Sequence, residues 1–432
     1  MKIALIGYGI EGASAYRYLH GMYPDASFEI FDSAKELKAA PPASVVVHSG
    51  VEDFRDIDAD MVVRTPSIAP NRISSRGTVT SVTNLFFAAC EAPIIGVTGT
   101  KGKGTTATLI ANILQKAGVK TWLVGNIGLP ALDVLEGINQ SVMNGEDSVV
   151  VYELSSFQLW DIEQSPQVAV VLMIEPEHLD VHGTLEDYVA AKEHITAYQT
   201  EDDAVIYFAS NPSAEKIALA SLGEKIPYTV TKEENDIVVD GTPIVSKKDI
   251  GLLGEHNIGN VQAAVLAAWQ FTQDVTAIRQ AVQEFHGLPH RLERVAEKNG
   301  ILYINDSFAS APPAVLAAVQ AFSRPEILIM GGFDRGLDFT QLASDIAKNT
   351  QVKQIYLIGQ TRQRIAEAFE KAGIKNYESI DGDLGEALEK AHQVAVPGDV
   401  VLLSPGCASF DMFKDFVERG NEFKRLVGEL DG

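Results

Sequence analysis

Short apolar stretches alternate with longer amphipathic stretches along this chain. KIALIG (2–7) and SFEIFD (27–32) have the length and composition of buried strands, and EGASAYRYLHGMY (11–23) between them has helical spacing. Two more strands are expected, at SVVVH (44–48) and DMVVRT (60–65). Strands that alternate with helices in this way are typical of α/β layers with largely parallel sheets. The pattern therefore predicts an α/β fold.

Residues 93–287 form the second predicted domain, which follows a first domain of residues 1–92. Pro93 opens the buried-strand pattern PIIGVT, and a glycine-rich turn leads from it into the helix pattern TTATLIANILQKAG. The pair Asp240-Gly241 inside NDIVVDGTPIVS is a strong hairpin signal. The remaining predicted elements are the strands KTWLVG, SVVVYEL and VAVVLM and the helices LEDYVAAKEHITAY, NIGNVQAAVLAAWQF and VTAIRQAVQEF.

A third domain is predicted over residues 288–432. The segment HGLPHRLERV (286–295) is punctuated by glycine and proline, which is typical of a linker. After it, the strand patterns GILYIND, EILIMGG, KQIYLIG and DVVLLSPG alternate with helices, which indicates a further α/β unit. A chain of 432 residues is longer than one hydrophobic core usually serves, so division into domains is expected.

Composition narrows the possible partners. Hydrophobic content of 46% and charged content of 22% are ordinary for a globular enzyme. A net charge of −23 argues against a nucleic-acid or anionic-membrane surface, because both need a positive field. Cys90 and Cys407 have no metal-ligand spacing and suit a reducing compartment. We find no signal segment and no apolar run near the roughly 20 residues that span a bilayer. We expect a cytoplasmic monomer that acts on small molecules.

The glycine-rich turn VTGTKGKGTTA (97–107) departs from the pattern G-x-x-x-x-G-K-[ST] at Val97 and Gly104. A turn from a buried strand into a helix N-terminus still aims unpaired backbone N–H groups and a positive dipole end at one point. Lys103 can reach outer phosphates there, and a threonine hydroxyl can meet phosphate or Mg²⁺. We therefore predict a nucleotide-phosphate site. Its candidate residues are Gly99, Thr100, Lys101, Gly102, Lys103, Gly104, Thr105 and Thr106.

Two polar residues follow neighbouring strand patterns. Glu153 ends SVVVYEL, and His178 lies soon after VAVVLM. Because side chains at the carboxyl edge of a parallel sheet meet ligands, both are candidate Mg²⁺ ligands. A helix-capping glutamate and a surface histidine are equally favoured readings of the same residues. For Lys192 in AAKEHI, the pattern alone favours a solvated helical lysine.

The stretch GYGIEG (7–12) fits G-x-G-x-x-G after a strand, and Asp32 lies at a later strand end. Taken alone, this pattern predicts a dinucleotide such as NAD, with Asp32 on a ribose. An NAD-dependent oxidoreductase is therefore one hypothesis. It leaves the turn at 97–107, Glu153, His178 and the third domain unexplained.

Blocks from all three domains, taken together, resemble the Mur ligase family. Within that family they are most similar to the branch that adds D-glutamate to UDP-N-acetylmuramoyl-L-alanine. The turn GTKGKG alone looks more like the related folylpolyglutamate synthases, so the other blocks decide. These are GNIGLPAL, ELSSFQL, EHLDVHG, HNIGNVQAA, LPHRLE, INDSFA, GGFDRG and LSPGCASFDMFKDFVERGNEF.

The resemblance implies an ATP-dependent ligase of peptidoglycan precursor synthesis. ATP phosphorylates the substrate carboxylate, and an amine then attacks the acyl phosphate. Three domains are implied: a Rossmann-like N-terminal domain for the UDP-sugar, a central P-loop mononucleotide-binding ATPase domain, and a C-terminal Rossmann-like domain for the amino acid. Two Mg²⁺ ions are implied as well. The substrates are UDP-N-acetylmuramoyl-L-alanine, D-glutamate and ATP, with no nucleic-acid or membrane partner.

The family's site residues carry over onto matching positions of this chain. Lys192 lies 14 residues after His178, as in the family, where the lysine is carbamylated by CO₂. The implied catalytic residues are Lys103, Glu153, His178 and Lys192, and the implied metal ligands are Thr105, Glu153, His178 and Lys192. Beyond the phosphate turn, ATP contacts are implied for Asn257, Asn260, His290, Arg291 and Asp306. The implied UDP-sugar contacts are Ile10, Glu11, Asp32, Ser33, Asn126, Gln158 and His182, and the amino-acid contacts are Arg335, Ser409 and Phe416.

Three positions depart from the family pattern. Phe308 stands where well-studied members have lysine, Ala34 stands where arginine is frequent, and TPSIAP replaces the usual SPG. Arg335 also takes the place of a common lysine but can still clamp a carboxylate through its planar fork. Phe308 leaves the choice between D- and L-glutamate open. A folate-polyglutamylating ligase and a non-catalytic nucleotide-binding regulator remain alternatives.

Overall fold

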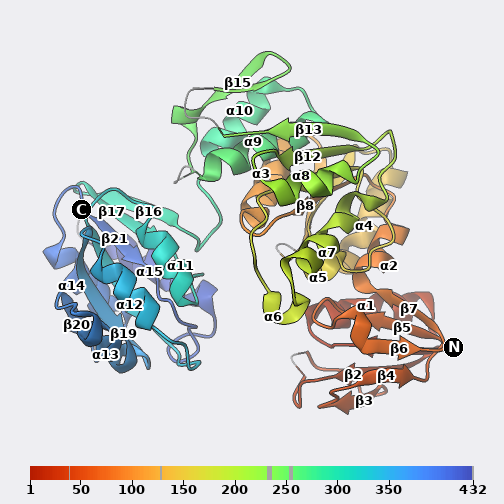
Figure 1. Cartoon of the computed structure of the whole chain (residues 1–432), viewed down its shortest axis with the longest axis horizontal. Coiled ribbons are helices and arrows are strands. Elements are labelled where there is room, and N and C mark those ends of the chain that lie inside the picture. Colours follow the sequence, from red (N-terminus) through yellow and green to blue (C-terminus); the bar gives the residue numbers. More distant parts are fainter. Residues whose placement is uncertain (38, 127–128, 231–235, 253–255, 431–432) are drawn as a thin grey trace. The chain divides into compact units, whose positions relative to one another are not determined.

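The computed structural model describes residues 1–37, 39–126, 129–230, 236–252 and 256–430. Ile127 and Gly128 of the GNIGLPAL block and Asn235 of the hairpin pattern lie outside these ranges. The fold is mixed α/β with largely parallel sheets, which confirms the fold class expected from the sequence (Figure 1). The chain divides into two compact units, Met1–Ile250 with Glu255–Glu284 and Gly251–Gly254 with Phe285–Gly432.

The first sheet of unit 1 has the order β3-β2-β1-β5-β7, and all of its pairs are parallel. Its strands are β1 (Lys2–Ile6), β2 (Ser27–Asp32), β3 (Val46–Ser49), β5 (Met61–Arg64) and β7 (Thr78–Ser81), and β4 (Phe54–Ile57) pairs separately with β6 (Ile73–Ser75). The helices are α1 (Ile10–Met22), α2 (Val82–Ala89) and the 3-10 turn η1 (Pro70–Arg72).

Close packing explains the glycines of GYGIEG. A Cβ on Gly12 would lie 2.4 Å from the Gly7 carbonyl oxygen, and one on Gly7 would lie 2.1 Å from Thr65 Oγ1. Glycine therefore lets α1 approach the end of β1 closely. The pattern has a packing reason that requires no dinucleotide.

The second sheet of unit 1 is entirely parallel, in the order β13-β12-β11-β8-β10-β9. Its strands are β8 (Ile94–Thr98), β9 (Lys120–Gly125), β10 (Ser148–Glu153), β11 (Val168–Val171), β12 (Ala204–Phe208) and β13 (Glu224–Tyr228). The helices are α3 (Lys103–Lys116), α4 (Ala131–Met143), α5 (Ser156–Leu159), α6 (Leu179–His182), α7 (Leu185–Ala197), α8 (Pro212–Leu219), α9 (His256–Trp269) and α10 (Val275–Glu284).

The hairpin predicted at Asp240-Gly241 is confirmed. Strands β14 (Asp236–Val239) and β15 (Thr242–Ser246) pair antiparallel, and the 3-10 turn η2 (Lys247–Asp249) follows. Asp240 and Gly241 have φ of 49° and 76°, the left-handed pair that a tight hairpin requires.

The two sheets of unit 1 share one hydrophobic core. A single cluster of buried side chains runs from Ile3 and Phe86 of the first sheet's layer to Ile94 and Tyr152 of the second. The boundary expected between residues 92 and 93 therefore falls inside a compact unit. Separate functional roles for its two halves stay a prediction.

Unit 2 contains a six-stranded sheet in the order β16-β17-β21-β18-β19-β20. Its strands are β16 (Glu293–Lys298), β17 (Ile301–Asn305), β18 (Glu326–Gly331), β19 (Val352–Ile358), β20 (Tyr377–Ser379) and β21 (Val400–Leu403). The helices are α11 (Pro312–Val319), α12 (Thr340–Ala347), α13 (Arg362–Ala372), α14 (Leu384–Val394) and α15 (Phe416–Glu429). Helices α11, α12 and α13 share a buried cluster with the sheet, and α14 and α15 share another.

The C-terminal end of the predicted linker is part of a β-strand. The second half of HGLPHRLERV enters β16, which pairs antiparallel with β17 while the other pairs of this sheet are parallel. Half-buried side chains on a strand at the sheet edge give a weak apolar signal, so the sequence pattern did not predict this strand.

No helix within the described ranges is both long and apolar enough to cross a membrane.

Glu326 is a buried acid at the start of β18. It is fully buried, and within the part of the chain that the structure describes neither of its carboxyl oxygens has a hydrogen-bond partner. Burial raises the pKa of Glu326 from 4.5 to about 8. Because the charged form is disfavoured in the folded state, the protein is most stable below pH 4.5 with respect to this group. That stability is lost as the pH rises toward 8.

We predict that Glu326→Gln removes this pH dependence. Glutamine resembles the protonated acid at every pH, so the variant and the parent should have similar stability near pH 5. At pH 8 the variant should be more stable, by up to about 5 kcal/mol at about 1.4 kcal/mol per pKa unit. Urea unfolding at both pH values measures the difference. Equal gains at the two pH values would contradict a titrating Glu326.

Candidate active site

The phosphate turn joins β8 to α3. Gly102 is the N-cap of α3 and has a left-handed φ of 86°, and Lys103 begins the helix. Lys103 Nζ donates to the carbonyl oxygens of Gly99 and Thr100, each at 2.9 Å. The hydroxyl of Thr106 is buried and finds no hydrogen-bond partner among the described residues. A buried hydroxyl and a lysine at a helix N-terminus, where backbone N–H groups lack intrahelical partners, fit an anionic ligand such as a nucleotide phosphate.

The first turn of α9 lies against this turn. A Cβ on Gly102 would stand 2.3 Å from Asn260 Oδ1, so only glycine permits the contact. Asn260 Nδ2 donates to Asn257 Oδ1 at 2.8 Å. The structure therefore brings the two expected asparagines together beside the phosphate turn.

Lys192 is buried next to the same turn. It is 1% exposed, and its Nζ donates to Thr98 Oγ1 and to the Gly99 carbonyl oxygen, each at 3.2 Å. The Nζ also lies 4.7 Å from the centre of the Tyr188 ring. Burial, followed by the charge of Lys103, holds the pKa of Lys192 well below its usual value, against opposing effects of Glu177 and Glu153. The pattern-based expectation of a solvated lysine is therefore wrong.

Glu153 lies at the carboxyl edge of the second sheet, and His178 lies in the segment after β11 as the N-cap of α6. Glu153 ends β10, pairs in register with Val97 of β8, and is 7% exposed. His178 is exposed, has a left-handed φ of 55°, and its Nε2 lies 3.8 Å from Glu177 Oε2. Among the residues that the structure describes, no three His, Cys, Asp or Glu side chains are placed to hold a metal ion. Mg²⁺ prefers oxygen ligands, so a site that uses the candidates Glu153 and Thr105, with the His178 imidazole, would need further oxygen ligands from phosphate, water or a modified lysine.

Short helix α5 connects this edge to the first sheet. Gln158 closes a capping box with Ser155, and its Nε2 donates to Glu11 Oε1 at 3.2 Å. On the same helix, Ser156 Oγ lies 3.0 Å from Nε2 of buried His182. Burial, followed by the charge of Lys192, lowers the pKa of His182 and favours its neutral ring. Glu11, Gln158 and His182 are thus joined through one four-residue helix.

The other candidates of the first domain surround the GYGIEG turn. The Asp32 carboxylate accepts the backbone N–H groups of Tyr8 at 2.6 Å and Ala34 at 2.8 Å, so it closes the turn. Ser33 is exposed, and Ile10 is 73% exposed although apolar. Asn126 is exposed directly after β9.

In unit 2, His290 and Leu292 flank Arg291 with left-handed φ of 65° and 45°. His290 Nδ1 lies 3.0 Å from Asn305 Nδ2, and Leu292 N donates to Asp306 Oδ1 at 3.1 Å. Burial raises the pKa of Asp306 to about 6. Strained backbone held by buried polar partners is typical of functional segments.

Phe308 has a definite partner here. The Arg291 guanidinium lies 4.3 Å over the Phe308 ring, and Phe308 packs edge-on against Phe416 at 5.1 Å. Phe308, which stands where the family pattern has a lysine, thus holds Arg291 through a cation–π contact. Arg335 lies 5.3 Å over the exposed Phe410 ring, while Ser409 is buried. Phe416 begins α15 and is partly exposed, so it is not a core aromatic.

Arg419 is a buried cation that the sequence reasoning missed. Its guanidinium donates to Ser307 Oγ at 3.0 Å and to the carbonyl oxygens of Ser307, Cys407 and Ala408 at 2.9–3.2 Å. It thereby ties the segment after β17 to the segment after β21. The available signal was its helical spacing with the apolar Phe423 and Val427 of α15, which places an arginine on a buried face.

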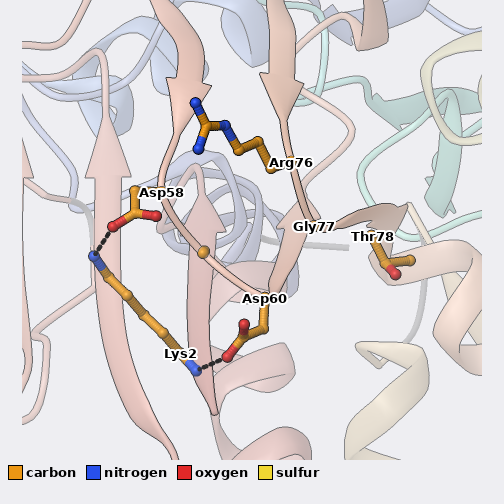
Figure 2. A pocket seen from close by; sticks show the side chains of 7 residues that line it. Lys2, Asp58, Asp60, Arg76, Gly77 and Thr78 are labelled. Atoms are coloured by element: carbon orange, nitrogen blue, oxygen red, sulfur yellow. Dashed lines mark hydrogen bonds and ion pairs between the residues drawn. The ribbon is translucent and has the colours of Figure 1, made fainter.

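A polar hollow of about 630 Å³ lies at the opposite edge of the first sheet (Figure 2). It is lined by Lys2 and Thr78, which begin β1 and β7, and by Asp60 and Arg76. Lys2 N donates to Asp60 Oδ2 at 2.7 Å. The lining includes both basic and acidic side chains. Ligands of parallel α/β sheets bind at the carboxyl ends of strands, so we assign the site to those ends and not to this hollow.

We predict that Gly102→Ala weakens nucleotide binding by about tenfold or more. A Cβ there meets Asn260 and also costs about 1–2 kcal/mol in the left-handed region. Gly118→Ala is the matched control, because Gly118 has a similar φ of 84° but no neighbour within 4 Å. The control should lose only thermal stability. Calorimetric titration with ATP measures affinity, and an unchanged affinity in folded Gly102→Ala would contradict the assignment.

Comparisons with known proteins identify the family of this chain. The family model of the Mur ligase middle domain matches residues 97–268, and that of the Mur ligase, glutamate ligase domain matches residues 290–407. The chain is 36% identical over 454 residues to a UDP-N-acetylmuramoylalanine–D-glutamate ligase of Clostridium kluyveri, covering 99% of this chain and 97% of that protein. It is also 36% identical over 473 residues to the enzyme of that name from Acetivibrio thermocellus, covering 100% and 97%.

Solved structures support the fold. A UDP-N-acetylmuramate-alanine ligase from Thermotoga maritima matches with a TM-score of 0.59 at 18% identity, over 99% of both chains. A Mycobacterium tuberculosis folylpolyglutamate synthase matches with a TM-score of 0.56 at 17% identity, over 81% of this chain and 93% of that one. At these identities the structures indicate a shared fold only. The full-length relatives and the domain matches together establish that the chain belongs to the Mur ligase family.

Proposed function

We propose that this protein joins D-glutamate to UDP-N-acetylmuramoyl-L-alanine and converts ATP to ADP and phosphate. The observation that carries the proposal is the pair of lysines, Lys103 and buried Lys192, held with Glu153 around the phosphate turn. The relatives that share 33–36% identity over nearly the whole chain are named for this reaction. The product would serve peptidoglycan precursor synthesis.

Phosphoryl transfer to a carboxylate brings several negative charges together. In this structure Lys103 donates hydrogen bonds to two carbonyl oxygens of its own turn. It can donate to phosphate oxygens in their place when a nucleotide binds. The substrate carboxylate oxygen attacks the terminal phosphorus of ATP, ADP leaves, and an acyl phosphate forms. The amine of glutamate then attacks the acyl carbon, loses a proton and expels phosphate. Cations and helix dipole stabilise the charge that develops in both steps, and Mg²⁺, when bound, neutralises phosphate charge.

The assignment of binding regions follows the family arrangement. Residues 1–92 form a Rossmann-like UDP-sugar domain, 93–287 a P-loop ATPase domain and 288–432 a Rossmann-like amino-acid domain. Gln158 and Glu11, which bond across the first two regions, support a shared substrate surface. The proposed UDP-sugar contacts are Ile10, Glu11, Asp32, Ser33, Asn126, Gln158 and His182. The proposed ATP contacts outside the turn are Asn257, Asn260, His290, Arg291 and Asp306, and the proposed amino-acid contacts are Arg335, Ser409 and Phe416.

Carbamylation of Lys192 is part of the proposal. CO₂ reacts with a neutral amine, and burial lowers the pKa of Lys192 so that the neutral form is accessible. The carbamate converts a cation into a carboxylate within reach of the turn. It would join Thr105, Glu153 and His178 as a ligand of Mg²⁺. A cytoplasmic monomer remains the expectation.

Phosphate release tests the function. The purified protein with ATP, Mg²⁺, UDP-N-acetylmuramoyl-L-alanine and D-glutamate should release phosphate, and omission of the uridine substrate should abolish release. L-glutamate in place of D-glutamate tests the preference that Phe308 leaves open. Release that depends instead on a folate and L-glutamate would replace the proposal with the polyglutamylation reaction.

We predict that carbon-13-labelled bicarbonate gives a carbamate NMR signal that Lys192→Ala abolishes. The same variant should lose about 10²-fold or more in kcat, because it removes a ligand and a charge from the reaction centre. Acetate, a small carboxylate, should restore part of the activity. Lys348→Ala is the control, because the Lys348 side chain is 72% exposed and belongs to no proposed site. A carbamate signal that persists in Lys192→Ala would contradict this assignment.

A further inference from the structure

Arg64 is a fully buried cation at the end of β5. Its Nε donates to Asp161 Oδ2 at 2.7 Å, and its Nη2 pairs with Asp161 Oδ1. Both terminal nitrogens also donate to the Phe157 carbonyl oxygen at 3.2–3.3 Å. The Ile68 carbonyl oxygen accepts from Nη1 at 3.2 Å. The planar fork thus joins the first sheet to the segment that contains α5.

A second residue of the first domain holds the same segment. Asn84, on α2, donates through Nδ2 to the Asp161 carbonyl oxygen at 2.9 Å. Its Oδ1 accepts the Glu163 backbone N–H at 3.0 Å. The segment is therefore fixed from two elements of the first domain.

The same segment, Phe157–Asp161 with the preceding Ser156, also contacts candidate site residues. Gln158 donates to Glu11, and Ser156 Oγ lies 3.0 Å from His182 Nε2. The Phe157 ring stacks on His182 at 5.3 Å and lies 5.0 Å from the His178 ring. Displacing the segment by a fraction of an ångström would move all of these groups together.

A contribution to stability does not explain well why Arg64 and Asp161 form a buried ion pair. Desolvating two charges is costly, and well-packed apolar residues of the same volume often stabilise a protein equally or better. A buried fork that satisfies five acceptor atoms, the two Asp161 oxygens and the carbonyl oxygens of Thr65, Ile68 and Phe157, does, however, fix geometry. We propose that Arg64 is a positioning residue, which sets the Phe157–Asp161 segment so that Glu11, Gln158 and His182 present one surface to the uridine-sugar substrate. This inference rests on the proposed function.

A matched control exists in the same unit. Arg17 and Asp133 form another bidentate pair between the first two predicted domains, at 2.7–3.1 Å. The Arg17 side chain is 56% exposed, and the pair joins α1 to α4 without touching α5. Both pairs cross the same boundary, but only Arg64 holds the segment of the site.

Steady-state kinetics of phosphate release test the inference. Arg64→Met should lower kcat/KM for UDP-N-acetylmuramoyl-L-alanine by about ten- to hundredfold, because small displacements of positioned groups have effects of that size. KM for ATP should change less than twofold, since the hydrogen bonds of Arg64 to described residues all lie outside the phosphate turn. Arg64→Lys should recover only part of the loss, because an ammonium group lacks the fork. Arg17→Met should leave both KM values unchanged.

A double variant distinguishes a loss of stability from a loss of positioning as the cause of the kinetic effect. Arg64→Met leaves Asp161 unpaired, so Arg64→Met with Asp161→Leu removes the stranded charge and should regain thermal stability. If Arg64 positions the site, the raised KM for UDP-N-acetylmuramoyl-L-alanine persists in this double variant. Full recovery of KM together with stability would overturn it, as would an unchanged KM in an active Arg64→Met enzyme. A parent protein without ATP-dependent phosphate release would instead overturn the proposed function, and the inference with it.

Discussion

Electrostatic repulsion between a nucleotide triphosphate and a carboxylate is the constraint on which the rest of this structure depends. In the proposed function, the turn between β8 and α3 offsets this repulsion with helix N–H groups, Lys103 and a glycine that lets Asn260 approach. Lys192 adds a second amine at the Gly99 carbonyl oxygen. Two lysines so close together are compatible only because burial and mutual repulsion lower the pKa of Lys192. The two amines and the helix N-terminus that the proposed reaction needs are therefore already close together in this structure.

Buried charge recurs at the carboxyl edges of the sheets. Arg64 ends β5, Glu153 ends β10, and Arg419 ties together the segments after β17 and β21. Each charge is costly to desolvate, and Arg64 and Arg419 make hydrogen bonds to several backbone carbonyl groups. Glu326 lies at the opposite end of its strand and has no such partners. The charges at the carboxyl edges thus organise loops, while Glu326 remains a cost to stability.

Local patterns predicted much of the fold. Strands buried on both faces, the glycine turn and the Asp240-Gly241 hairpin are written in short windows of sequence, and they lie where expected. The burial of Lys192 and Arg64 could not be read in this way, because it depends on side chains distant in the chain. Strand β16 was missed for a related reason: an edge strand with half-buried residues resembles a linker. The resemblance to a family supplied the roles of residues, and the structure supplied their partners.

The central claim is that ATP's terminal phosphate is transferred to the carboxylate of the uridine-linked substrate. Oxygen-18 placed in that carboxylate measures the transfer directly, by mass spectrometry of the phosphate released. An acyl phosphate gives up one carboxylate oxygen when the amine displaces phosphate, so the account predicts one labelled oxygen in each phosphate. Phosphate without label, formed at the same rate as the amide product, would contradict it.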